Sequence, residues 1–301
     1  MDAKTNWAKK FAGTTTAIVT PFESDGKVDY KALKNLIEYN ISGGVSGIVV
    51  MGTTGESPTL DHEEHQKVIK FVIDEVKKRV NVIAGTGSNA TSEAIKLTEF
   101  AKKAGADAAL LMNPYYNTPT QQGQYLHFKA VADSTKIPIL IYNIQGRTGV
   151  NLETPTLLRL INDCENIVGV KEASGNIEQI KSVIEVAPEN FCVLSGDDKL
   201  TLDVIKAGGD GIISVASNIV PDRISKMTKA ALEGKIKEAE EMNKELIPLY
   251  GACFYETNPL PIKFMLAQKG MCKEIYRLPM CEMMPESKKR VLEVMKQTKL
   301  L

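Results

Sequence analysis

The chain has 301 residues, 37 basic and 37 acidic residues, and therefore a formal net charge of zero, with 43% hydrophobic residues. This length excludes a disulfide-stapled mini-protein, and the hydrophobic content excludes a disordered chain. The neutral balance argues against nucleic acid or an anionic membrane as a partner, because either would require a basic excess.

The first ten residues carry three lysines with no apolar core after them, so we expect no signal peptide. The longest uncharged stretches, 41–55 and 108–126, are interrupted by Gly, Pro and Asn, which argues against a membrane helix. The five cysteines are an odd number and lack a C-x-x-C spacing, which is typical of a reduced, intracellular protein. We therefore predict a cytoplasmic location.

Short apolar runs alternate with helix-like segments along the first 215 positions. The runs are continuous rather than alternating in polarity, which indicates parallel strands covered on both faces. Amphipathic segments between them, such as 61–79 and 92–104, predict helices. The eight runs are 14–20, 47–51, 81–84, 108–112, 138–142, 167–171, 191–194 and 211–215.

Some helix ends can also be located. Asp61 followed by Glu64 has the spacing of a capping box, and Gly105 and Gly208 stand where a helix would end before a strand. The role of Trp7 stays open between a packing anchor and a mobile residue.

Eight strand–helix units over roughly 210 residues predict an α/β fold, a (β/α)8 TIM barrel. An open doubly wound sheet is the alternative, although such sheets favour fewer repeats and a glycine-rich phosphate loop. After Val220 the strand signals stop, and 226–249 and 262–269 look helical on either side of a break at 258–261. We expect a barrel domain over 8–225 and a C-terminal helical extension over 226–301.

In a barrel of this type the reacting groups lie at the carboxyl ends of the strands. Lys171 ends the sixth run, where a poorly solvated amine could attack a carbonyl; the alternative is a lysine paired with Glu172. Tyr142 ends the fifth run and could move protons, or it could simply bond a backbone carbonyl. Arg147 suits a carboxylate, or it could form an ion pair within its loop.

Two further motifs favour small anions over nucleotides or metals. The turn 52–57 has glycines and hydroxyls before a helix but lacks a nucleotide-binding pattern, so it suits a carboxylate as well as a phosphate. His62 and His65 are spaced to share a helix face but do not form the H-E-x-x-H motif of zinc enzymes. We expect no metal site and no organic cofactor.

These residues together resemble the dihydrodipicolinate synthases, a branch of the pyruvate-dependent, Schiff-base class I aldolase family that also contains the N-acetylneuraminate lyases. The resemblance covers about residue 13 to residue 301. The motifs that carry it are 52–57 (GTTGES), 84–87 (AGTG), 114–117 (PYYN), 142–143 with 147–149 (YN and RTG), 169–173 (GVKEA), 194–198 (LSGDD) and 258–261 (NPLP).

The resemblance implies a role for each matching residue. Lys171 would form an imine with pyruvate, and Tyr142 would relay protons together with Thr53 and Tyr116, the last from a neighbouring subunit. Thr54 and the Ile213 backbone would hold pyruvate. Arg147 would orient the carboxylate of L-aspartate 4-semialdehyde. The implied reaction is the condensation of these two substrates, without a cofactor, in diaminopimelate and lysine biosynthesis.

The resemblance also implies a regulatory site and an assembly. Many family members are inhibited by L-lysine at a dimer interface and are homotetramers built as dimers of dimers. Glu93 would pair with the lysine ammonium. Pro58 replaces a common alanine. The matching positions are Ser57, Pro58, His62, His65, Asn89, Glu93 and Tyr115.

Two alternatives are kept. One is another pyruvate-dependent lyase acting on a 2-keto-3-deoxy sugar acid or on N-acetylneuraminate; Arg147 and the Thr53–Thr54 pair favour the synthase, because sialic-acid lyases lack this arginine and usually have Ser-Thr. The other is a non-catalytic barrel that binds a small carboxylate. One departure from the synthase pattern is Ile144-Gln145 in place of the usual Val-Pro, which removes a restriction on the loop that carries Arg147.

Overall fold

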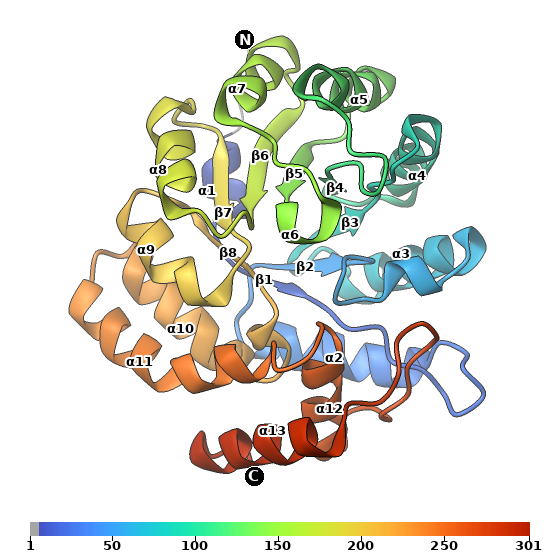
Figure 1. Cartoon of the computed structure of the whole chain (residues 1–301), viewed down its shortest axis with the longest axis vertical. Coiled ribbons are helices and arrows are strands. Elements are labelled where there is room, and N and C mark those ends of the chain that lie inside the picture. Colours follow the sequence, from blue (N-terminus) through green and yellow to red (C-terminus); the bar gives the residue numbers. More distant parts are fainter. Residues whose placement is uncertain (1–5) are drawn as a thin grey trace.

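The chain folds into a closed barrel of eight parallel strands, β1 to β8 in chain order (Figure 1). The structure is a computed structural model that describes residues 6–301. Because β1 pairs with β8, from Gly13 opposite Gly211 to Thr16 opposite Ser214, the sheet has no open edge and the doubly wound alternative is excluded. All eight predicted runs are strands: β1 (Gly13–Ala17), β2 (Gly47–Val50), β3 (Asn81–Gly85), β4 (Ala108–Met112), β5 (Ile139–Asn143), β6 (Ile167–Glu172), β7 (Cys192–Ser195) and β8 (Gly211–Ser214).

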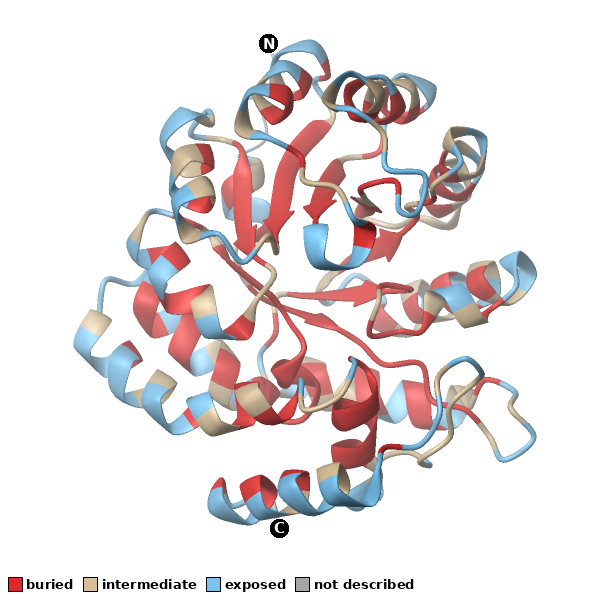
Figure 2. Cartoon of the chain, in the orientation of Figure 1, coloured by how far each residue is buried: buried red, intermediate tan, exposed pale blue. Residues whose placement is uncertain are grey.

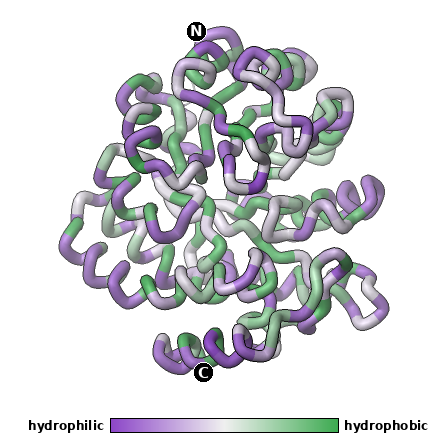
Figure 3. Tube along the Cα trace, viewed as in Figure 1, coloured by the Kyte–Doolittle hydropathy of each residue, from purple (hydrophilic) through white to green (hydrophobic). Residues whose placement is uncertain are grey.

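A ring of helices surrounds the barrel and covers its outer face (Figure 1). The buried residues are concentrated in the strands and on the inner faces of these helices, and the hydrophobic segments follow the same distribution (Figures 2 and 3). The predicted TIM barrel is therefore confirmed. The ring consists of α2 (Tyr30–Ser42), α3 (His62–Val76), α4 (Thr91–Ala104), α5 (Gln121–Ser134), α7 (Thr154–Asp163), α8 (Ile177–Val186), α9 (Thr201–Lys206) and α10 (Pro221–Leu232).

The remaining elements are short turns at the strand ends and the terminal helices. In the C-terminal part, the charged segment 226–249 is divided between α10 and α11 by a turn at 233–235. The expected domain boundary after residue 225 falls inside α10, which packs against β1 and β8, so the two-domain division stays a proposal. These elements are α1 (Trp7–Phe11), η1 (Ser57–Thr59), α6 (Gln145–Thr148), η2 (Asp198–Leu200), η3 (Ala216–Asn218), α11 (Ile236–Ala252), α12 (Leu260–Gln268) and α13 (Pro285–Gln297).

The predicted helix ends are present, with one change. The Asp61 carboxylate accepts a hydrogen bond from the Glu64 backbone N–H at 2.8 Å and begins α3. The Glu64 carboxylate does not close the capping box; it binds Arg277 through two hydrogen bonds of 2.7 Å. Gly105 ends α4 with a φ of +97°, in the left-handed region that favours glycine.

The two largest apolar clusters of residues 6–301 hold the barrel together. The larger one lies between the strands and the helices, and the smaller one fills the barrel interior. Phe11 from α1 belongs to the interior core and is almost fully buried, so α1 closes the amino-terminal end of the barrel. Trp7 stacks on Phe11 with ring centroids 6.2 Å apart, which makes it a packing anchor.

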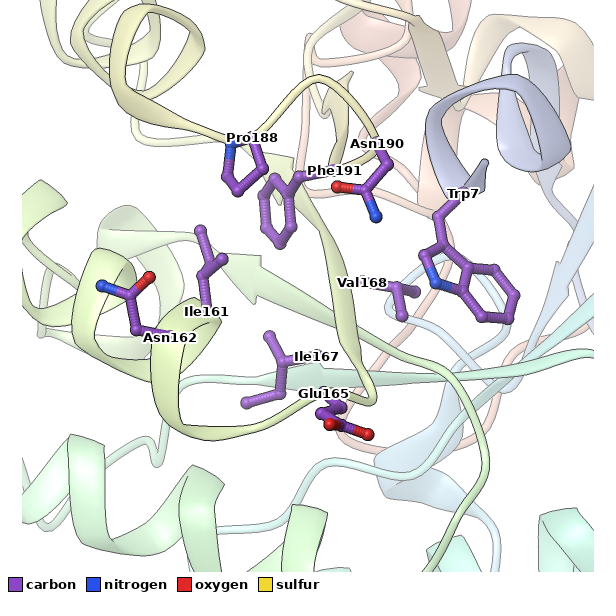
Figure 4. A pocket seen from close by; sticks show the side chains of 9 residues that line it. All are labelled: Trp7, Ile161, Asn162, Glu165, Ile167, Val168, Pro188, Asn190 and Phe191. Carbon is purple, nitrogen blue, oxygen red and sulfur yellow. The ribbon is translucent and has the colours of Figure 1, made fainter. Parts of the chain in front are cut away.

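A cavity of about 520 Å³ lies beside Trp7, next to the beginnings of β6 and β7 (Figure 4). Ile167, Phe191 and Glu165 line it, and it contains none of the candidate site residues. Catalysis in such barrels takes place at the opposite, carboxyl ends of the strands. No helix of the described residues is long and apolar enough to cross a membrane.

Candidate active site at the carboxyl ends of the strands

Lys171 and Tyr142 lie side by side at the ends of β6 and β5. The two residues are register partners, and the Lys171 Nζ is 4.0 Å from the centroid of the Tyr142 ring. The register between β5 and β6 shifts by one residue after Ile139, which places Tyr142 opposite Lys171 rather than Val170. Because successive side chains of a strand face opposite sides, this shift decides that the two groups meet.

Glu172 does not pair with Lys171, as the alternative interpretation required. Its carboxylate accepts hydrogen bonds of 2.7 Å from the Asn143 amide and the Ser174 hydroxyl. Asn143 and Glu172 are the next register pair after Tyr142 and Lys171, so their bond ties the two strands together directly behind these two residues. Burial raises the pKa of Glu172, although these hydrogen bonds oppose the effect.

The absence of a side chain at Gly196 leaves room for Lys171. A Cβ at this position would lie 3.0 Å from the Lys171 Cε and 2.6 Å from the Ala173 Cβ. Sequence reasoning included Gly196 in a motif without assigning it this role, because the contact arises only when β6 and β7 are adjacent.

The turn after β2 presents two hydroxyls at the same end of the barrel. Thr54 is buried, and its hydroxyl accepts a hydrogen bond from the Asn258 amide at 3.0 Å. Thr53 is half-buried and lines a cavity described below. The turn is closed by the Glu56 N–H, which donates to the Thr53 carbonyl at 3.1 Å.

Ile213 lies near the end of β8 with its side chain in the interior core. The segment that follows is held by Asp198, whose carboxylate accepts from the Ser214 hydroxyl at 2.5 Å and the Val215 N–H at 3.0 Å. Asp198 is buried, and burial raises its pKa. Its position in the sequence motif alone did not predict this anchoring role.

Arg147 is exposed on α6, a single helical turn that follows β5. Its Nη2 donates to the Asn258 carbonyl at 3.2 Å and to the Thr257 hydroxyl at 3.4 Å, rather than forming an ion pair with a described residue. Gln145, where the synthase pattern usually has proline, begins this turn, and Gly149 ends it with a φ of +80°. The segment therefore forms a helical turn without the proline.

Tyr116 is the one candidate that the single chain does not bring to the others. Its side chain is 89% exposed, and its backbone has a φ of +74°. Within the described chain it forms no hydrogen bond with Tyr142 or Thr53. This exposure is compatible with the implied contribution of Tyr116 to a neighbouring subunit.

A cavity of about 410 Å³ connects the mouth of the barrel with the expected lysine site. Thr53 and Arg147 line it together with Ser57, Pro58, His62, His65, Glu93 and Tyr115. Asn89, the seventh position, does not line it; its carbonyl accepts from the Asn117 amide at 2.9 Å.

Glu93 is the carboxylate that lines this cavity. It accepts from the His62 Nε2 at 2.8 Å and from the Ser88 hydroxyl. Burial lowers the pKa of His65 to about 4, with the nearby His62 as a smaller cause, so His65 is neutral at physiological pH. Burial also raises the pKa of Tyr115.

Sequence reasoning missed Lys263, which forms an ion pair with Glu56 inside the protein. A signal was available, because Lys263 is a lone cation within the apolar segment LPIKFML. Asn258 was identified only as part of a motif, yet it contacts both Thr54 and Arg147.

Comparison with known proteins identifies the family. Residues 10–298 match the model of the dihydrodipicolinate synthetase family. The chain belongs to this family. It is 48% identical to the 4-hydroxy-tetrahydrodipicolinate synthase of Aquifex aeolicus, over 96% of this chain and 98% of that protein. As a member of the dihydrodipicolinate synthetase family it is an enzyme of the lyase class, which excludes the non-catalytic barrel.

Two of the solved structures that this chain resembles contain a bound small molecule. The first is the chloride-inhibited dihydrodipicolinate synthase from Acinetobacter baumannii complexed with pyruvate, with a TM-score of 0.95, 41% identity and coverage of 97% of this chain and 100% of that one. The second is the enzyme from Cyanidioschyzon merolae with lysine bound, with a TM-score of 0.94, 38% identity and coverage of 97% and 99%.

Proposed function

We propose that this lyase condenses pyruvate with L-aspartate 4-semialdehyde to form 4-hydroxy-tetrahydrodipicolinate, in diaminopimelate and lysine biosynthesis. The observation that carries the proposal is the contact between Lys171 and Tyr142 at the carboxyl ends of adjacent strands. The names of the relatives agree with it, and one neighbouring structure is a complex with pyruvate.

In the proposed reaction the Lys171 amine attacks the C2 carbonyl of pyruvate and water leaves, which gives an imine. The protonated imine accepts electron density when the methyl group loses a proton, so an enamine forms. The enamine carbon then attacks the aldehyde carbon of the semialdehyde. Finally the amine of the second substrate attacks C2, closes the ring and releases Lys171.

Each remaining group has a proposed part in these steps. Tyr142, Thr53 and a Tyr116 from a neighbouring subunit move the protons, because hydroxyl groups can both donate and accept them. Thr54 and the Ile213 backbone hold pyruvate. Arg147 binds the carboxylate of the semialdehyde, since a guanidinium matches the geometry of that group.

The test is borohydride reduction in the presence of pyruvate. We expect a reduced pyruvate adduct on Lys171, located by mass spectrometry, and no adduct in Lys171→Ala. The absence of an adduct on the wild-type protein would refute the whole proposal. Turnover with L-aspartate 4-semialdehyde and none with N-acetylneuraminate or 2-keto-3-deoxy sugar acids would then separate the synthase from the other pyruvate-dependent lyases.

We also propose that L-lysine inhibits the enzyme by binding in the cavity of about 410 Å³. Glu93 faces this cavity beside His62 and Tyr115, and a carboxylate there can pair with the ligand's ammonium group. The cavity also reaches Thr53 and Arg147, so its occupant would lie beside the substrate groups. A neighbouring structure has lysine bound.

The lysine proposal predicts that millimolar L-lysine slows the condensation and that Glu93→Gln weakens this inhibition about tenfold or more, because one charge-assisted bond is lost. The measurement is the inhibition constant of both proteins. Lys96→Met, on the same helix but outside the cavity lining, is the control. A wild-type rate that lysine does not change would contradict the proposal.

For the assembly and location we propose a cytoplasmic homotetramer, a dimer of dimers. Tyr116 supports a dimer at least, because its ring is exposed in the single chain. The five cysteines are all free, as in reduced compartments.

A further inference from the structure

One ion pair lies entirely inside the protein, beneath the turn that carries Thr53 and Thr54. Lys263 from α12 contacts the carboxylate of Glu56, and both side chains are fully buried. The Lys263 Nζ also lies 4.1 Å from the centroid of the Phe22 ring. Burial lowers the pKa of Lys263, whereas the nearby Glu56 carboxylate opposes this effect by favouring the charged form of the lysine.

Such a pair is unexpected if its only purpose is stability. Moving two charges out of water commonly costs more free energy than their mutual attraction returns. A protein in which an apolar pair of similar volume replaces the ion pair is therefore often at least as stable. The neighbours of Lys263 in α12 are what stability alone would favour, because Ile262, Phe264 and Met265 are apolar and buried. A role other than packing is therefore the better explanation.

The backbone at Glu56 gives the first indication of that role. Glu56 has a φ of +53°, in the left-handed region that non-glycine residues rarely occupy. Its N–H binds the Thr53 carbonyl at 3.1 Å, and its own carbonyl accepts from the Thr59 N–H at 2.9 Å. A group that holds the Glu56 side chain consequently holds the whole Thr53–Thr54 turn.

A second contact from the same segment reaches the turn independently. Asn258, just before α12, donates to the Thr54 hydroxyl at 3.0 Å while its carbonyl accepts from Arg147 at 3.2 Å. The segment just before α12 thus contacts the residues proposed to bind both substrates. The C-terminal extension is the part of the chain that links these two loops.

We propose that Lys263 is a positioning residue of the active site: its ammonium binds the Glu56 carboxylate and thereby keeps the Thr53–Thr54 turn in the geometry that receives the carboxylate of pyruvate. This inference rests on the proposed function. Lys263 touches no reacting atom and acts only through Glu56.

The test compares Lys263→Met and Glu56→Gln with a matched control, Lys288→Met. Lys288 also belongs to the C-terminal extension and pairs with Glu274 and Glu282 at 2.8 Å, neither of which belongs to the turn. We expect the pyruvate concentration that half-saturates borohydride trapping on Lys171 to rise about tenfold in both variants. A change of this size corresponds to the loss of roughly one hydrogen bond to the pyruvate carboxylate. At saturating pyruvate, the amount of adduct trapped on Lys171 in both variants should match that of the wild type. The half-saturating pyruvate concentration of the control variant should also match that of the wild type.

Stability is separated from positioning by the double variant Glu56→Gln/Lys263→Met. It leaves no uncompensated buried charge, so it should regain thermal stability that Lys263→Met loses. Its half-saturating pyruvate concentration should nevertheless stay high. Wild-type pyruvate affinity in the double variant, or in a folded single variant, would overturn the proposal.

Hydrogen exchange provides a readout that does not depend on the reaction. The amides of 52–56 should exchange faster in Lys263→Met, or in the double variant if the single one does not fold, but not in Lys288→Met. Unchanged exchange at this turn would overturn the inference. A wild-type protein without a pyruvate adduct would instead refute the proposed function and leave the exchange result to decide the role of Lys263.

Discussion

At the scale of single residues, the proposed chemistry depends on side chains that adjacent strands bring into contact. Lys171 meets the Tyr142 ring because β5 and β6 shift register by one residue, and Gly196 leaves space for the lysine stem. Directly behind them, the bond between Asn143 and Glu172 keeps the two strand ends aligned. Lys171 and Tyr142 are therefore positioned mainly by neighbours that take no part in the proposed reaction.

Arg147 allows a test of substrate binding at this scale. Arg147→Ala should lower kcat/KM for L-aspartate 4-semialdehyde about 100-fold, because a charged bidentate contact contributes a few kcal/mol. Pyruvate trapping on Lys171 should be nearly unchanged, since Arg147 lies on α6 and contacts Asn258 rather than Lys171. Steady-state kinetics and mass spectrometry measure the two effects. An equal loss of both would contradict the role assigned to Arg147.

At the scale of elements, the two ends of the barrel have different tasks. The carboxyl ends of the strands carry the polar candidate groups, whereas α1 closes the amino-terminal end with Phe11. The C-terminal extension adds a third contribution, because α12 and the residues before it contact Thr54, Glu56 and Arg147.

This separation predicts that stability and substrate affinity can be changed independently. Phe11→Ala should lower the free energy of unfolding by about 3–5 kcal/mol, since it removes a buried ring from the interior core. The KM values should change little, because the site lies at the other end of the barrel. Denaturant unfolding measures the loss, with the half-exposed Trp7→Ala as a milder comparison. A loss of unfolding free energy below about 1 kcal/mol would show that α1 does not stabilise the barrel by closing its amino-terminal end.

At the scale of the whole molecule, one proposed site residue stays apart from the others in the single chain. Tyr116 is exposed, while Lys171, Tyr142 and Thr54 are buried within the barrel mouth. If Tyr116 completes the proton relay of a neighbouring subunit, two differently inactivated chains must complement each other.

Mixed assemblies of Tyr116→Phe and Lys171→Ala chains test this. Each mutant alone should be strongly impaired, but a mixed dimer contains one site with both an intact Lys171 and an intact Tyr116. Random mixing in equal amounts, after dissociation and reassembly, should restore about a quarter of the wild-type activity, because half of the dimers are mixed and each has one functional site. No recovery would place Tyr116 in its own subunit's site or outside the reaction, and sedimentation measures the oligomeric state.

The sequence by itself determined the barrel and most of the candidate groups. Continuous apolar runs at regular intervals are a local property of parallel strands, so all eight strands could be predicted with small errors at their ends. Polar residues at the ends of those runs or directly after them identified Lys171, Tyr142 and the Thr53–Thr54 turn, because strand ends meet at one face of a barrel. The family resemblance added their proposed roles.

Only the tertiary structure decided which distant residues support the site. The pairing of Lys263 with Glu56 and the bond of Asn258 to Thr54 join segments about 200 residues apart, and no local pattern encodes such a distance. The same holds for Glu64, whose local spacing predicted a capping box but whose carboxylate binds Arg277 instead. A distant guanidinium that forms two charged hydrogen bonds competes successfully with a nearby backbone N–H, and this outcome depends on the packing of the complete chain.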